Sequence, residues 1–164
     1  MNMDDSIWSL LGLALLVFWL VGAYNRLVRL RADVNQSFAA LGAQLDQYSG
    51  LVSSWAMSGQ DLSALQTLLA TVHTLDGALH DCQGRLHQAD LLQALAAAVS
   101  EFDLHWQRLG EGSAVANDKQ RLSQDVARLR GLYNDAAALY NAAVGQFPAL
   151  VLARALSFKP VHPL

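Results

Sequence analysis

The stretch that decides the fold runs from Ser6 to Asn25 and reads SIWSLLGLALLVFWLVGAYN. It contains no charged residue. As a helix that rises about 1.5 Å per residue, these roughly 20 residues would span the ~30 Å hydrocarbon core of a bilayer. Trp8 lies near one end and Tyr24 near the other, and such rings favour the membrane–water interface. The stretch therefore predicts a transmembrane helix over residues 6–25.

The charges on either side of this segment predict its orientation. Acidic residues precede it and arginines follow it: Asp4 and Asp5, then Arg26, Arg29 and Arg31. Positively charged flanks are retained in the cytoplasm. We therefore expect a short extracytoplasmic N-terminus over residues 1–5 and a cytoplasmic location for everything after residue 25.

Two other interpretations of the segment remain open. A cleaved signal peptide is the first, because Val21-Gly22-Ala23 offers a small-residue cleavage pattern. However, the leading residues are acidic, whereas a signal peptide begins with positive charge, and the apolar run is long. A buried core helix is the second, although its flanks would be less polarised in charge. The flanks favour a permanent signal anchor.

The composition favours helices and argues against several classes of function. The chain is 53% hydrophobic and 15% charged, which is too apolar for a disordered protein. Alanine and leucine dominate, and β-branched residues are sparse. The net charge of −3 gives no reason to expect a nucleic-acid partner. The single cysteine, Cys82, excludes an intrachain disulfide and a thiolate zinc site, and its place on an apolar stripe predicts a core position.

Beyond the anchor, apolar residues recur in steps of three and four, as on one face of a helix. The first stripe continues the anchor without a helix breaker other than a tolerable Gly42, so one unbroken helix is expected. Three more helices are expected after it. The four stripes run from Leu27 to Trp55, from Leu62 to Leu86, from Leu91 to Leu109 and from Leu122 to Phe147.

Short connections separate these helices. Turns are expected at residues 56–61 and 85–90, with Asp90 as a candidate N-cap, and a loop at residues 110–117. Pro148 ends or kinks the last long helix. Because short connections favour antiparallel neighbours, the predicted fold is all-α: a transmembrane helix continuous with an antiparallel four-helix bundle over residues 26–147.

The predicted up-down-up-down order returns the end of the fourth helix to the membrane surface. Residues 148–164 are mostly apolar and are predicted to form a membrane-proximal amphipathic tail with a short interfacial helix, whose basic side chains reach anionic headgroups. The alternative is a tail that packs on the bundle. The expected membrane-interface residues are Trp8, Tyr24, Arg26, Arg29, Arg31, Arg154, Phe158 and Lys159.

Both ends of the predicted domain resemble a known family. YNRLVRLRADVNQSFAALGAQL (Tyr24–Leu45), directly after one membrane span, resembles the start of LemA-family proteins. LYNDAAALYNAAVGQFPALVLARALSFKP (Leu132–Pro160) resembles their C-terminal signature, and QYSGLVSSWAMSGQ (residues 47–60) departs from the basic, proline-containing stretch usual there. The positions that carry the resemblance are Tyr24, Asn25, Leu27, Tyr133, Asn134, Tyr140, Asn141, Phe147, Pro148, Ala153, Arg154, Phe158, Lys159 and Pro160.

The resemblance implies a bacterial, membrane-anchored helical protein without a known catalytic activity. The expected function is a scaffold that forms homo-oligomers on the inner membrane and organises or shapes it, with the lipid bilayer as a partner. The alternative is a signalling or adaptor module that binds a cytoplasmic protein. No cofactor is expected.

A row of histidines is the one sequence pattern that could indicate a metal site, and it has a simpler explanation. His73, Asp76 and His80 have a spacing that could place metal ligands on one helical face, and His87 continues the row. Each histidine follows a core-stripe position, however, so a polar row on the flank of the bundle is favoured, with a pH-sensitive contact as a further option. The sequence has no Gly-rich phosphate loop, nucleophile elbow or zincin motif, and we expect neither an enzyme nor a metal site.

Three Tyr-Asn pairs combine an apolar body with hydrogen-bonding groups. They are Tyr24-Asn25, Tyr133-Asn134 and Tyr140-Asn141. In the predicted bundle the first and the third approach the same membrane-facing end. They are expected either to tie the fourth helix to the first or to serve as ordinary core and surface residues.

Overall fold

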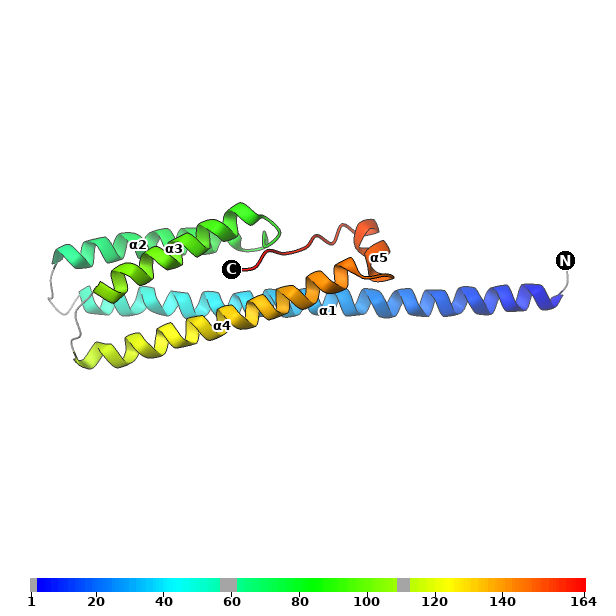
Figure 1. Ribbon diagram of the computed structural model, residues 1–164, viewed down its shortest axis with the longest axis horizontal. Helices are drawn as coiled ribbons and strands as arrows, with labels where there is room; N and C mark the ends of the chain where they lie inside the picture. The colour runs from blue at the N-terminus through cyan, green and yellow to red at the C-terminus, as the bar shows by residue number, and fades with distance from the viewer. Residues whose placement is uncertain (1–2, 57–61, 109–112) are drawn as a thin grey trace.

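The computed structural model describes residues 3–56, 62–108 and 113–164, and side chains within residues 7–54, 66–107 and 119–164. The described residues form helices and their connections, without a strand, which confirms the all-helical prediction. The helices are α1 (Met3–Ala56), α2 (Leu62–Cys82), α3 (Ala89–Arg108), α4 (Ser113–Gly145) and α5 (Ala149–Ala155) (Figure 1).

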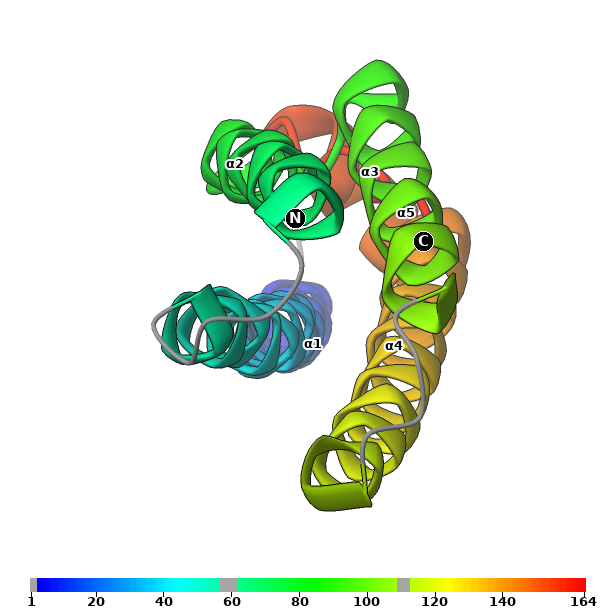
Figure 2. The ribbon, with the colours of Figure 1, turned by 90° about the vertical axis from the view of Figure 1, so that its left-hand side faces the viewer.

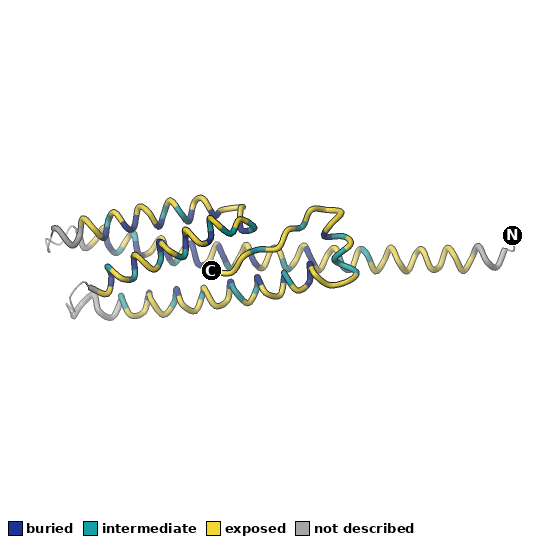
Figure 3. Tube along the Cα trace, turned by 45° about the horizontal axis from the view of Figure 1, so that its top comes forward, coloured by how far each residue is buried: buried dark blue, intermediate teal, exposed yellow. Residues whose placement is uncertain are grey.

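Helix α1 is unbroken, as its stripe pattern predicts, and it has two distinct halves. From Ile7 to Arg26 none of its side chains is buried, and Phe18 is 79% exposed. From Leu27 onward, one apolar stripe is buried against the other helices (Figure 3). The first half therefore projects beyond the helical domain, and the second half is part of its core.

The helices follow the predicted alternation of direction, and they associate in two pairs. Helix α4 packs antiparallel along α1, α2 and α3 form an antiparallel hairpin, and α2 also packs on α1 (Figures 1 and 2). In the described ranges, no Cα atom of α3 lies within 8 Å of one of α4. A closed four-helix bundle is therefore not confirmed.

The gap between α3 and α4 contains the end of the chain. Leu164 lines a narrow cavity together with residues of α1, α3 and α4, such as Leu45, Val99 and Val126. The C-terminal segment, residues 158–164, thus completes the apolar core on the side that the helices leave open.

Aromatic side chains fill the far end of the core. Tyr48 of α1 contacts Phe102 and Trp106 of α3, with ring centroids 4.6 Å and 5.6 Å away. The Tyr48 hydroxyl also lies 3.4 Å from Oγ of Ser123 in α4. One side chain of α1 therefore joins α3 to α4 where their backbones are apart.

Two helix starts differ from expectation. Helix α3 begins at Ala89, so Asp90 lies inside its first turn instead of capping it; there a carboxylate still interacts favourably with the helix dipole. Helix α4 begins at Ser113, so residues 113–117 are helical, consistent with the helix propensity of the alanines among them. Of the turn expected at residues 56–61, residues 57–61 lie outside the described residues. The same holds for residues 110–112 of the loop expected at residues 110–117, and for the side chain of Trp55.

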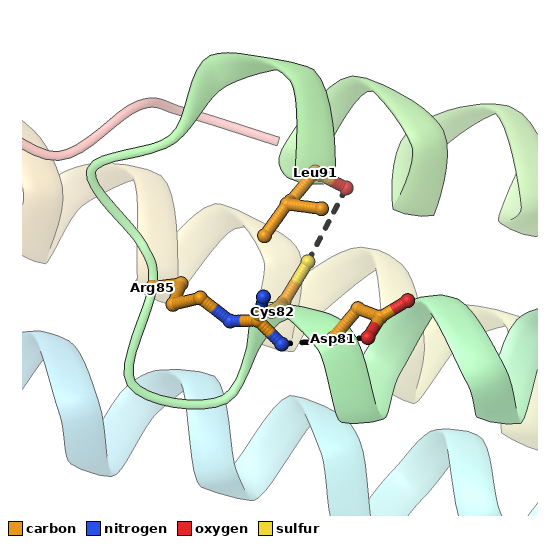
Figure 4. A network of polar contacts seen from close by, with 4 residues as sticks. All are labelled: Asp81, Cys82, Arg85 and Leu91. Atoms are coloured by element: carbon orange, nitrogen blue, oxygen red, sulfur yellow. Dashed lines mark hydrogen bonds and ion pairs between the residues drawn. The ribbon is translucent and has the colours of Figure 1, made fainter.

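The turn between α2 and α3 explains the position of Cys82. The chain turns at Gly84, whose φ of +74° lies in the left-handed region that favours glycine. Cys82 is buried, and its Sγ–H donates to the carbonyl of Leu91 at 3.3 Å, while Arg85 pairs with Asp81 at 3.4 Å (Figure 4). Burial raises the pKa of the thiol. The predicted core position of Cys82 is confirmed.

Candidate functional site

The site is the C-terminal segment and the surface of α4 that holds it. The Phe147–Pro148 peptide is cis, and α5 lies at 92° to α4, so the fourth long helix ends where Pro148 predicts. After α5, Ser157 adopts a left-handed φ of 56°, and the chain then runs back along the helices (Figure 1). The tail is therefore helical only over Ala149–Ala155; residues 158–164 pack on the domain, as in the alternative interpretation.

Two asparagines of α4 hold the backbone of this segment. The Asn141 amide donates to the carbonyl of Val161 at 2.7 Å, and its Oδ1 accepts from the Val161 N–H at 2.9 Å. Asn134 makes the same pair of bonds with Leu164, at 3.0 Å and 2.9 Å. Each asparagine thus satisfies both backbone polar groups of one residue, as a neighbouring strand would.

The tyrosine before each of these asparagines adds a bond to another carbonyl of the segment. The Tyr140 hydroxyl donates to the carbonyl of Lys159 at 3.1 Å, and the Tyr133 hydroxyl donates to that of His162 at 2.7 Å. Burial raises the pKa of Tyr133 to about 12 and raises that of Tyr140 as well. Both phenols therefore stay protonated, and able to donate, well above neutral pH.

Further bonds anchor the segment at its far end. Nε of Arg130 donates to the carbonyl of Leu164 at 2.9 Å. The N–H of His162 donates to the carbonyl of Leu86, in the turn between α2 and α3, at 3.1 Å. The segment therefore connects α4 to the α2–α3 hairpin.

Ring contacts fix the tail against α1. Phe158 lies edge-on to Tyr24, with centroids 6.4 Å apart, and the guanidinium of Arg31 lies 5.7 Å from the Phe158 ring centroid. Phe147 contacts Trp19 at 5.4 Å. The tail thus packs on α1 over the boundary between its exposed apolar half and its buried half.

The Tyr-Asn pairs act differently from the expected direct link between helices. Tyr133 does contact Phe38 of α1, at 5.7 Å. The asparagines of α4, however, hold the C-terminal segment, and Asn25 is exposed. Tyr24 contacts Phe158, and the Tyr140 hydroxyl donates to the carbonyl of Lys159, so both tyrosines contact the C-terminal segment. Neither of the two interpretations of the pairs included this role of the segment.

The predicted site residues differ in how far they are exposed. The cationic side chains of the expected membrane interface are all exposed: Arg26, Arg29, Arg31, Arg154 and Lys159. Trp8, Tyr24, Phe147 and Pro160 are also exposed; Asn134, Asn141, Pro148 and Phe158 are half-buried; and Leu27, Tyr133, Tyr140 and Ala153 are buried.

The histidine row lies on the flank of α2. His73 and His80 are exposed, and His87 is half-buried in the following turn. Among the described residues, no three His, Cys, Asp or Glu side chains come together as a candidate metal site. The described histidines of this row therefore do not form part of a grouped set of metal ligands.

Comparison with known proteins adds no assignment: no family model, curated protein or solved structure matches this chain. Of the described helices, α1 alone is long and apolar enough to cross a membrane by itself, with a mean hydropathy of 2.1 over 18 residues that are not buried. A signal sequence near an N-terminus would have the same properties.

Proposed function

We propose that this chain is a non-catalytic, membrane-anchored scaffold protein, a divergent member of the LemA family, which assembles with copies of itself on the bacterial inner membrane. One observation carries the proposal: α1 runs unbroken from an exposed apolar half into the core of the helical domain. A continuous helix transmits the position of the anchor to the domain without a flexible linker.

The proposed topology places the N-terminus outside and the helical domain in the cytoplasm. Arg26, Arg29 and Arg31 follow the apolar half of α1 and are exposed, where an anionic leaflet would attract them. Arg154 of α5 and Lys159 are exposed on the tail that packs beside this boundary. These charges and the ring contacts at Trp19 and Tyr24 support a membrane surface at this level of α1.

Exposed apolar side chains on the helical domain support self-assembly. Leu132 and Leu139 are 48% and 61% exposed, and they lie one heptad apart on α4. Leu104 of α3 is also exposed. Exposed apolar residues that recur on one helix face favour association with another helix.

The test is direct imaging of the full-length protein in native membrane particles and in mild detergent, by light scattering followed by electron microscopy. A scaffold should give large uniform particles or filaments from the purified chain alone. Clean monomers in both environments would contradict self-assembly. Cysteine-accessibility labelling at an engineered site in α4 would check the proposed cytoplasmic location.

The structure also favours one alternative, an adaptor that binds a cytoplasmic protein. The C-terminal segment is held mainly through its backbone, which is how proteins recognise extended peptides of varied sequence. An extended segment of a partner would satisfy the same groups of α4. Dependence of the assemblies on a second protein would distinguish the adaptor from the scaffold.

A further inference from the structure

A cavity of 180 Å³ lies where α1, the α2–α3 turn and the C-terminal segment meet. Nitrogen-bearing side chains from all three line it: Arg31, His87 and Lys159. No carboxylate is among the described residues that line the cavity. The electrostatic potential inside should therefore be positive.

Neutral hydrogen-bonding groups complete the lining. Asn35 and Ser157 each contribute a side chain with a donor group, whereas the hydroxyl of Tyr140, which also lines the cavity, already donates to the carbonyl of Lys159. Gly84 forms part of the wall, and a Cβ atom added there would meet nothing within 4 Å, so its surroundings are open. The combination of cationic and neutral donors suits an anion with several oxygen atoms.

The charges that line the cavity are not neutralised within the described structure. The ion pairs among the described side chains are Arg85–Asp81 and Arg128–Asp125. None of these four residues lines the cavity, although Arg85 lies between the lining residues Gly84 and Leu86 in the chain. The guanidinium carbon of Arg31 lies 5.7 Å from the Phe158 ring centroid, a cation–π contact that leaves its charge in place. A guanidinium can bind phosphate oxygens in a bidentate manner, and a lysine adds a point charge.

We propose that this cavity binds a phosphate or diphosphate group, held by Arg31 and Lys159, with His87 and the neutral donors as additional contacts. Because Lys159 and Ser157 belong to the C-terminal tail, a bound phosphate connects the tail to α1 and to the α2–α3 turn. The ligand therefore stabilises the docked position of the tail.

Two sources can supply this chemistry. Arg31 lies seven residues beyond Tyr24, which is about 10 Å along the helix. Each headgroup layer of a bilayer is roughly 5–8 Å thick. If Tyr24 marks the interface, the cavity lies at the outer edge of the headgroups, within reach of both a lipid phosphate and a free phosphorylated compound.

The experiment uses the full-length chain in phosphatidylcholine nanodiscs and measures inorganic pyrophosphate binding by calorimetry at roughly 50 mM salt, where screening is modest. Arg31→Gln and Lys159→Gln should each weaken binding by about tenfold, since each removes a charge-assisted contact. Arg29→Gln is the matched control, because Arg29 is exposed on the same helix and does not line the cavity. Thermal unfolding of each variant checks that it is folded.

A second set of nanodiscs containing anionic phosphatidylglycerol distinguishes the sources. If the lipid phosphate occupies the cavity, apparent pyrophosphate affinity falls in these discs, and Arg31→Gln removes that difference. If the physiological ligand is free, the affinity is the same in both discs. The proposal is overturned by no pyrophosphate binding in phosphatidylcholine discs, by unchanged binding in Arg31→Gln and Lys159→Gln, or by an equal loss in Arg29→Gln.

Discussion

Asn134 and Leu164 are joined by a pair of hydrogen bonds, and the same pair recurs between Asn141 and Val161. The two asparagines are seven residues apart on a helix, or about 10.5 Å. Their targets are three residues apart on an extended chain, or about 10 Å. The equal spacing explains why a heptad repeat of Tyr-Asn on α4 fits a backbone that runs antiparallel to it.

This match predicts the effect of removing one amide. Asn141→Ala leaves the N–H and the carbonyl of Val161 without their partner, so the variant should lose roughly 1–3 kcal/mol of unfolding free energy. Amide exchange at Val161 should accelerate at least about tenfold, in proportion to local opening. Hydrogen exchange by mass spectrometry over residues 158–164 measures this directly.

A matched control for that variant is Gln120→Ala, because Gln120 is an exposed amide residue on the same helix. It should leave both the stability and the exchange of the C-terminal segment unchanged. If Asn141→Ala behaved like Gln120→Ala, the docked segment would not be the conformation of the chain in solution.

The raised pKa of Tyr133 leads us to expect that the unfolding free energy falls at alkaline pH. Its pKa is raised from 10.0 to about 12 by burial, so the folded state keeps the phenol protonated where the unfolded chain has begun to lose the proton. The contribution is fully present below pH 10 and is lost as the pH rises to about 12, by roughly 2–3 kcal/mol in total. Urea unfolding at a series of pH values would show this decline.

Tyr133→Phe separates the titration from the hydrogen bond. At pH 8 the variant should be less stable by roughly 1–2 kcal/mol, because the carbonyl of His162 loses its donor. Between pH 10 and 12 its stability should fall less than that of the wild type. An identical alkaline slope in both proteins would contradict a raised pKa at this position.

The sequence predicts the helices well because their periodicity is a local property. The apolar stripe of α1 and the break at Pro148 are both found, and Cys82 is in the core. The sequence offers the docking of residues 158–164 on the domain only as an alternative, because this docking depends on side chains that bind a backbone distant in the chain. The heptad spacing of Asn134 and Asn141 is the sequence signal for this docking. It can be interpreted only when the extended segment that matches this spacing is known.

The arrangement of the helices shows the same limit. Short connections predict antiparallel neighbours, yet in the described ranges no Cα atoms of α3 and α4 lie within 8 Å of each other, although Lys119 of α4 donates to the carbonyl of Gln107 in α3. The reason is that Leu164 and Tyr48 supply core volume between them. A pattern of stripes identifies which face of each helix is buried but not which element covers it.

The aromatic cluster predicts a contrast between two neighbours on α3. Phe102 is 1% exposed and contacts Tyr48 and Trp106, so Phe102→Ala should cost about 3–5 kcal/mol of unfolding free energy. Leu104, two residues on, is 55% exposed, so Leu104→Ala should change stability by less than about 0.5 kcal/mol. Denaturant unfolding of both variants gives the comparison. Equal losses of unfolding free energy would contradict the inward orientation of Phe102 and the outward orientation of Leu104 on α3.

Replacing Gly42, where α1 contacts α2, with alanine should stabilise the protein. A Cβ atom added there would lie 3.4 Å from the nearest carbons of Leu79, a contact that the leucine can accommodate. Gly42→Ala should therefore stabilise the protein by up to about 1 kcal/mol through helix propensity. Gly50→Ala, where a Cβ meets nothing, measures propensity alone. Gly42→Leu should instead destabilise by about 1–3 kcal/mol through overpacking, and a neutral result would mean that α2 lies further from α1.

The exposed leucines of α4 predict which surface self-association uses. Leu132 and Leu139 bury little area in the single chain, so Leu132→Glu with Leu139→Glu should leave its unfolding free energy within about 0.5 kcal/mol of the wild type. The same charges would oppose one another, or remain unpaired, wherever two copies met on this face. Light scattering in mild detergent should therefore shift from large particles to monomers. Gln93→Glu with Ser100→Glu, at two exposed polar positions one heptad apart on α3, is the control for a general effect of added charge. Equal loss of particles in that variant would exclude the α4 face as the specific contact.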